Sequence, residues 1–185
     1  MQKLTIDEIR KHFESSKEFN EIFDAFDQAI EQRFNDIELY RQLFWNPILT
    51  PDELCFFGEK LVKEFPALSY DVYMWLANVF EVTYSMFDNY ELALEYYKKA
   101  APVRPSSSEP YLAAAACHEP DLNIPPITAL IDFLKKGTEY VTDAKLIYEK
   151  LVYLYEIIGN DEMCDYYRRK LEKGPEPPEG PSPEQ

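Results

Sequence analysis

The sequence contains very little glycine and no glycine-rich loop. Only five of its 185 residues are glycine, three of these lie beyond residue 158, and Gly58 and Gly137 stand alone. Neither the GxGxxG spacing of dinucleotide-binding loops nor a Walker phosphate loop occurs. The sequence therefore excludes the commonest designs for binding nucleotides, and we expect no cofactor.

Cysteines and long apolar runs are also scarce. Cys55, Cys117 and Cys164 form no CxxC pair, and an odd number of isolated cysteines favours a reducing compartment, in which each behaves as a small buried hydrophobe. No segment approaches the roughly 20 apolar residues of a membrane span, and residues 1–13 lack the apolar run of a signal peptide. We expect a soluble, cytoplasmic protein.

Basic residues are far fewer than acidic residues. The chain has 34 acidic and 19 basic residues, which gives a formal net charge of −15. A surface this acidic repels phosphate backbones and anionic lipid headgroups, so we expect neither nucleic acid nor membrane as a partner. The excess of acid either attracts a basic protein segment or serves only for solubility, and composition leaves both interpretations open.

Candidate catalytic groups are few. The two histidines are His12 and His118, and His118 lies between Cys117 and Glu119. Neighbouring residues on a helix point about 100° apart, so these three side chains cannot converge on one metal ion. The acids of residues 18–31 recur every three or four positions, which indicates a solvated stripe and not two carboxylates in a cleft. We therefore predict no enzymatic activity, no catalytic residue and no metal site.

Helical periodicity runs through nearly all of residues 1–173. Capping patterns mark helix starts, as at Thr5 with Glu8 and at Thr50 with Glu53, where a proline takes the first helical position. No segment of useful length alternates polar and apolar residues as a strand would. The predicted helices form five pairs, 5–14 with 17–34, 36–46 with 50–64, 70–87 with 89–101, 108–118 with 124–138, and 144–158 with 160–173.

An internal repeat relates these pairs. Tyr40, Tyr73, Tyr111 and Tyr148 open the first helix of pairs two to five, at spacings of 33, 38 and 37 residues. A pair of apolar residues follows each tyrosine three and four positions later, so these side chains share one helical face. A single hairpin cannot bury that face alone, and the repeat therefore predicts hairpins that stack on one another.

The third pair carries large, small and aromatic residues at regular spacings, and these are Tyr73, Leu76, Ala77, Phe80, Tyr90, Ala93, Tyr97, Ala100 and Pro105. With these residues the pair resembles a tetratricopeptide (TPR) repeat. The first helix of that family has a large residue, then Leu-Gly, then an aromatic, and the second has aromatics alternating with alanines before a proline. Pairs four and five share this phase in part, and the second pair fits it least.

The resemblance implies an all-α, right-handed α-solenoid of about five antiparallel hairpins over residues 1–173. Ala93 and Ala100 are small enough for two helices to approach closely. About one helical turn more than the family spacing separates Phe80 from Tyr90, which predicts a longer first helix in this pair. The implied function is a non-catalytic protein–protein interaction module, a scaffold or adaptor.

In the family, the first helices line a concave groove, and the phase of the tyrosines assigns the groove positions here. The assigned surface is acidic with apolar spots, which suits a basic, partly hydrophobic protein segment. The predicted groove residues are Arg41, Trp45, Asp71, Met74, Asn78, Glu81, Glu109, Leu112, Ala116, Glu149, Tyr153 and Glu156.

Other interpretations of the same sequence stay open. The chain could be a small acidic TPR-type chaperone for a client or secretion substrate, or a permanent subunit of a larger assembly, and the groove positions could simply be solvated. Partner identity and oligomeric state have no signature in the sequence. Residues 174–185, with five prolines and three glutamates, are predicted to be a disordered tail, and their PxxP spacings leave a docking motif as the alternative.

Overall fold

The computed structural model describes residues 3–83 and 87–173. All regular structure in these ranges is helical, with ten α-helices, two short 3-10 helices and, in place of any strand, a single β-bridge between Glu119 and Ile124. The prediction of an all-α chain is thereby confirmed for this part of the protein. The predicted disordered tail, residues 174–185, lies outside the described residues.

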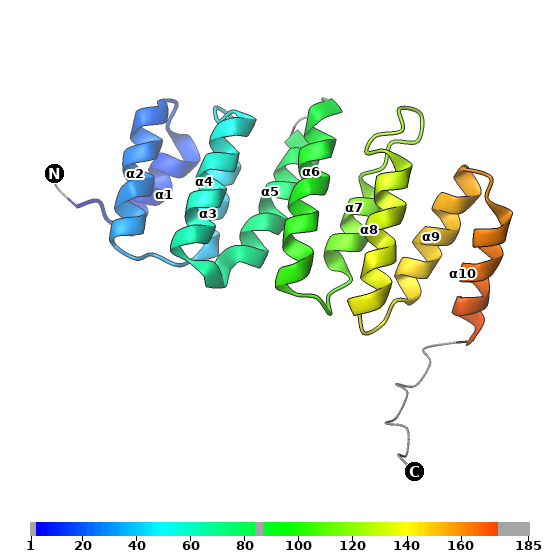
Figure 1. Ribbon diagram of the computed structural model, residues 1–185. Coiled ribbons are helices and arrows are strands. Elements are labelled where there is room, and N and C mark those ends of the chain that lie inside the picture. The colour runs from blue at the N-terminus through cyan, green and yellow to red at the C-terminus, as the bar shows by residue number, and fades with distance from the viewer. Residues whose placement is uncertain (1–2, 84–86, 174–185) are drawn as a thin grey trace, which may run out of the picture. The chain divides into compact units, whose positions relative to one another are not determined.

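The chain divides into two compact units, residues 1–104 and 105–185. A single repeat domain over residues 1–173, and the stacking of its hairpins into one right-handed solenoid, stay predictions. In the first unit the second helix of each pair contacts the next second helix, and the first helices likewise contact one another (Figure 1). Its helices are α1 (Ile6–Ser15), α2 (Phe19–Glu31), α3 (Ile37–Phe44), α4 (Pro51–Glu64), η1 (Pro66–Leu68), α5 (Ser69–Thr83), α6 (Phe87–Ala100) and η2 (Ala101–Val103).

The capping patterns in the sequence mark true helix starts. Thr5 Oγ1 accepts a hydrogen bond from Glu8 N at 3.3 Å, and the Glu8 carboxylate accepts one from Thr5 N at 2.7 Å. Thr50 and Glu53 repeat this reciprocal arrangement at the start of α4. Such caps satisfy backbone N–H groups that have no partner within the helix. Helix boundaries accordingly follow the prediction to within three residues, as at the end of α2, expected at residue 34 and observed at Glu31. The expected continuation of α5 over residues 84–86 lies outside the described residues.

Small residues occupy the sites where helices of the first unit meet. Ala93 and Ala100 of α6 are fully buried, and Tyr97 beside them is 1% exposed. In α4, Gly58 lies where this helix meets α5 of the next pair, because a Cβ built on it would lie 2.3 Å from Cδ1 of Leu76. The approach of α4 to α5 therefore depends on glycine.

The second unit is built from two further helix pairs. A Cβ on Gly137 of α8 would lie 2.8 Å from Cδ1 of Tyr111 in α7 and 3.0 Å from Cδ1 of Ile147 in α9, so one glycine allows two helices to approach α8. Gly159, at φ +67°, makes the turn after α9 in a conformation that other residues rarely adopt. The helices of this unit are α7 (Glu109–Ala116), α8 (Ile127–Tyr140), α9 (Lys145–Ile157) and α10 (Asp161–Lys173).

The repeated tyrosines have a common structural role. In three pairs the tyrosine of the first helix contacts an aromatic ring of the second. The ring centroids are 6.0 Å apart for Tyr73 and Tyr96, 4.5 Å for Tyr111 and Phe133, and 5.8 Å for Tyr148 and Tyr167. Each of these contacts joins the two helices of one hairpin, which is why the tyrosines recur in phase.

Candidate protein-interaction surface

The twelve predicted groove residues are all accessible to solvent, since none falls in the buried class. Six belong to the first unit and lie on α3 and α5 or, for Trp45, directly after α3. The other six lie on α7 and α9 in the second unit. Taking each unit by itself, we describe these positions as the α3–α5 face of the first unit and the α9 face of the second. The α7 residues Glu109, Leu112 and Ala116 precede the α9 face in the sequence.

The α3–α5 face comprises Arg41, Trp45, Asp71, Met74, Trp75, Asn78 and Glu81. Arg41 holds its guanidinium 5.5 Å from the centre of the Trp75 ring and pairs with Glu38 at 3.0 Å. Trp45 is 39% exposed, although a large aromatic side chain is usually well covered. Two indole rings and a methionine therefore lie on the first-helix side of this unit.

Trp75 is absent from the predicted groove, yet its spacing could have revealed it. It lies four residues after Asp71 and three before Asn78, which places all three on one side of α5. The phase taken from Tyr73 selected Met74 instead. Both side chains are half-buried, so the exposed surface of α5 is wider than one row of residues.

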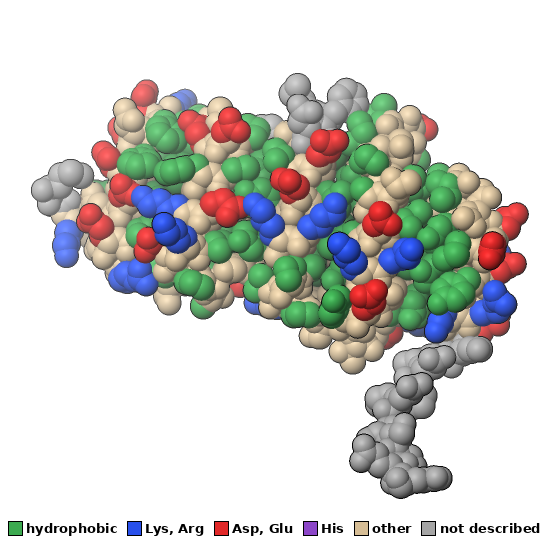
Figure 2. All heavy atoms as spheres, viewed as in Figure 1, with side chains coloured by type: hydrophobic (Ala, Val, Ile, Leu, Met, Phe, Trp, Pro, Cys, Tyr) green, Lys and Arg blue, Asp and Glu red, His purple; other side chains and the backbone are tan. Residues whose placement is uncertain are grey.

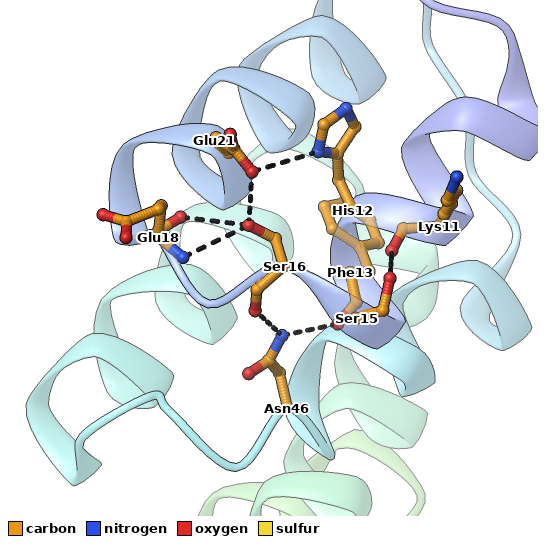
Figure 3. Close-up of polar contacts among 8 residues, drawn as sticks. All are labelled: Lys11, His12, Phe13, Ser15, Ser16, Glu18, Glu21 and Asn46. Atoms are coloured by element: carbon orange, nitrogen blue, oxygen red, sulfur yellow. Dashed lines mark hydrogen bonds and ion pairs between the residues drawn. The ribbon is translucent and has the colours of Figure 1, made fainter.

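Trp45 is positioned by a buried polar side chain next to it. Asn46 is 3% exposed, and its Nδ2 donates hydrogen bonds to the carbonyl oxygens of Phe13 at 2.9 Å and Ser16 at 3.1 Å (Figure 3). Its Oδ1 accepts a hydrogen bond from Ile48 N at 3.1 Å. These bonds connect the turn after α3 to the C-terminal end of α1. The backbone next to Trp45 is therefore fixed both by α1 and by a bond within its own turn.

Several of the predicted groove acids already have partners. Asp71 pairs with Arg104 at 3.4 Å, and the Arg104 guanidinium lies 3.8 Å from the centre of the Tyr70 ring. Glu156 pairs with Arg168, and Glu81 accepts a hydrogen bond from the Tyr97 hydroxyl at 2.8 Å. The two ion pairs partly neutralise the field of Asp71 and Glu156, whereas the hydroxyl of Tyr97 leaves the charge of Glu81 in place. The faces are therefore less negative than their acid count indicates.

The α9 face comprises Leu146, Glu149, Tyr153, Glu156 and Ile157. Leu146, Tyr153 and Ile157 are 53%, 49% and 43% exposed, and their spacings of seven and four residues align them along one side of the helix. Glu149 and Glu156 run along one flank of this apolar stripe. Counting from Tyr153 at helical spacing would have found Leu146 and Ile157, which the prediction omitted.

The opposite side of α9 forms the core of the second unit. Ile147, Leu151 and Leu154 are buried to 1% exposure or less, and Tyr155 stacks on Tyr167 with ring centroids 5.8 Å apart. Burial raises the pKa of Tyr167 to about 12. The helix is thus apolar on two sides, and only one of them is covered within its unit.

The residues around His118 form a packed helix end. His118 Nδ1 lies 3.0 Å from the carbonyl oxygen of Pro125, and the buried Cys117 thiol donates to the carbonyl oxygen of Ala113. Within residues 3–83 and 87–173, no group of three His, Cys, Asp or Glu side chains is placed to hold a metal ion. Burial raises the pKa of the Cys55 thiol, which disfavours the reactive thiolate.

None of the helices in the described ranges combines the length and apolar character needed to cross a bilayer.

These features define an all-α protein of paired helices with accessible aromatic side chains on its first helices. No protein-family model matches the sequence, and no curated protein matches it either. Among solved structures, the chain described as MamA MSR-1 C2 is similar at 16% sequence identity, with 90% of this chain and 92% of that chain covered and a TM-score of 0.47. So distant a likeness says nothing about what this chain binds.

Proposed function

We propose that this protein is a non-catalytic protein–protein interaction module whose first helices bind a basic, partly hydrophobic segment of another protein. The observation that carries the proposal is the α9 face, an apolar stripe of three large side chains that lies opposite a complete core and beside two carboxylates. The all-helical architecture and the resemblance of residues 73–105 to a TPR repeat support it.

The apolar residues supply the binding energy in this proposal. Covering apolar surface contributes about 25 cal/mol per Å², and a well-packed aromatic anchor is often worth 2 kcal/mol or more. Trp45 and Tyr153 are the aromatic anchors of the two faces, with 39% and 49% of their surfaces exposed. Binding removes this surface from water without disturbing the core on the other side of each helix.

In this proposal, the negative charge of the chain speeds its association with a basic segment and makes the binding selective for that segment. A net charge of −15 attracts a basic segment from a distance and repels acidic competitors. Glu149 is exposed beside Tyr153, so it is placed to meet a lysine or arginine of the partner. Glu156 would first have to release Arg168.

Substitution of the two anchors tests the proposal. Once a partner has been isolated, Trp45→Ala and Tyr153→Ala should each weaken its affinity by at least about tenfold, because each removes an exposed anchor. Tyr166→Ala is the matched control, since Tyr166 is 43% exposed on α10 and outside both faces. Unchanged affinity in both anchor variants would place the binding surface elsewhere.

Charge reversal tests separately whether negative charge steers the partner toward the surface. Glu149→Lys should slow association and reduce its salt dependence, whereas Glu139→Lys, the same change on α8, should alter both less. Glu149 suits this test better than Glu81, because Glu81 accepts the hydrogen bond of the nearly buried Tyr97 and its loss would also affect stability. Equal effects of the two reversals would show that only the total charge matters.

A further inference from the structure

Aromatic rings continue from the core of the first unit to its surface between α2 and α4. Phe26 packs edge-on against Phe57 with ring centroids 4.8 Å apart, and both rings are buried. Phe56 meets Phe57 at 5.5 Å and stacks on Phe23 at 6.1 Å with an angle of 23° between the planes. Phe56 is nevertheless 46% exposed and ends this series of rings at the surface.

This surface lies on the second helices, away from the residues of the α3–α5 face. Figure 2 shows hydrophobic side chains gathered over α2 and α4, with acidic side chains close to them. Phe19 extends the cluster, with its ring centroid 6.0 Å from that of Phe23 and 5.9 Å from that of Phe57. We name Phe19, Phe23 and Phe56 the ring patch. Its members hold one another in place, so little conformational freedom remains to be lost on binding.

The protein already places one cation against these rings. Lys60 Nζ lies 5.4 Å from the centre of the Phe23 ring and 5.6 Å from that of Phe26, and it pairs with Asp27. A cation within about 6 Å of a ring centre is attracted by the electron density of the ring face. Lys60 thus shows the combination of ring and carboxylate that a cationic side chain of another molecule would need.

A further carboxylate adjoins the part of the ring patch that Lys60 does not cover. Asp52 lies four residues before Phe56 on the same side of α4, whereas Asp24, next to Phe23 in α2, points about 100° away from it around the helix. Both are exposed, and no ion pair joins either of them to a cation in the part of the chain that the structure describes. Exposed rings and a carboxylate therefore lie together, while two such surfaces on copies of a chain with a charge of −15 would repel each other.

We propose that the ring patch binds a basic segment of a partner protein, with an arginine or lysine side chain laid over Phe23 and Phe56 and its charge directed to Asp52. This surface is independent of the first-helix faces, so a partner can contact both sides of the first unit. Arginine suits it best, because a planar guanidinium stacks on a ring and donates to carboxylates at its edge.

The test uses the full chain and two labelled helical peptides, one made of leucine, alanine and arginine and the other identical except that citrulline replaces each arginine. Citrulline keeps the planar shape but carries no charge. Fluorescence anisotropy should show that the wild-type chain prefers the arginine peptide. Phe56→Leu, which keeps an apolar side chain but removes the ring, should weaken binding of that peptide about tenfold, and Phe56→Tyr should preserve it.

The two surfaces are distinguished by crossing the variants. The proposal expects Trp45→Ala to leave the Phe56-dependent part of the binding intact, and expects Asp52→Asn to flatten the salt dependence. If Phe56→Leu binds the arginine peptide as the wild type does, the ring patch is not the site, whatever Trp45→Ala does. If Trp45→Ala alone abolishes binding, the proposed function stands and the ring patch fails. Equal binding of the arginine and citrulline peptides would also overturn the proposal.

Discussion

Helices α4 and α6 both pack against α5, α4 from the preceding pair and α6 from the same pair, and each carries small buried residues. In α6, Ala93 and Ala100 are fully buried and keep the good helix propensity of alanine. In α4, Gly58 brings the backbone so close that even a Cβ would lie 2.3 Å from Leu76. Glycine costs about 1 kcal/mol of helix propensity relative to alanine, and α4 accepts that cost where α6 does not. The comparison shows that α5 is approached by two helices, one from the preceding pair and one from its own, which carry small buried residues of different kinds.

The two helices are alike in how each contacts the preceding second helix. Lys60 of α4 pairs with Asp27 of α2 and lies over Phe23 and Phe26. Lys99 of α6 pairs with Glu59 of α4, and its Nζ lies 4.5 Å from the centre of the Tyr96 ring. Both helices thus carry a lysine that pairs with an acid of the preceding second helix, although their small residues differ.

The largest effect is expected from enlarging Gly58. Gly58→Val should lower the free energy of unfolding by about 3 kcal/mol, because the new side chain overlaps Leu76 and the backbone must separate. Chemical denaturation measures the change. Ala116→Val is the control, since Ala116 is exposed on α7 and has room for the added atoms. A stability equal to that of the wild type would mean that α4 does not approach α5 so closely.

Enlarging the alanine of α6 should cost less. Ala100→Leu adds volume at a fully buried position and should lower the free energy of unfolding by about 1–3 kcal/mol. The expected order, Gly58→Val above Ala100→Leu, follows from the tighter approach at α4. If Ala100→Leu left the melting curve unchanged, position 100 would not lie on the buried side of α6.

The lysine contacts should contribute least. Lys60→Met keeps an apolar stem but removes the charge, and it should cost about 1 kcal/mol, since exposed ion pairs and cation–π contacts are each worth about that or less. Lys99→Met should cost less again, because the Lys99 side chain is 43% exposed against 31% for Lys60. Thermal denaturation at low and high salt checks both. A larger loss for Lys99→Met than for Lys60→Met would contradict this ordering.

The sequence predicted the helices and the packing of α6 because both depend on local patterns. Thr5 with Glu8 predicted the start of a helix, and the spacing of Ala93, Tyr97 and Ala100 predicted a buried face. Gly58 was not recognised as a packing residue because the pattern asked for alanine, and a lone glycine in a helix has no periodicity of its own.

The exposure of the candidate residues followed from helical phase, but the ion pairs of their acids did not. Helical phase alone placed Trp45 and Tyr153 at the surface. The partners of the acids come from residues that local patterns cannot connect: Arg104 lies 33 residues from Asp71, and Arg168 lies 12 residues from Glu156. Such pairs depend on how the two helices of a hairpin fold back on each other, so only the three-dimensional structure shows that these acids are partly neutralised.

Photo-crosslinking tests the binding role of the first helices most directly. Benzoylphenylalanine would replace Trp45, Tyr153 or the control Tyr166, one at a time, in cells, and mass spectrometry would identify the crosslinked peptides. The account predicts adducts at positions 45 and 153 with segments that carry lysine or arginine beside apolar residues, and few at position 166. Equal yields at all three positions, or adducts at 45 and 153 only with acidic segments, would contradict it.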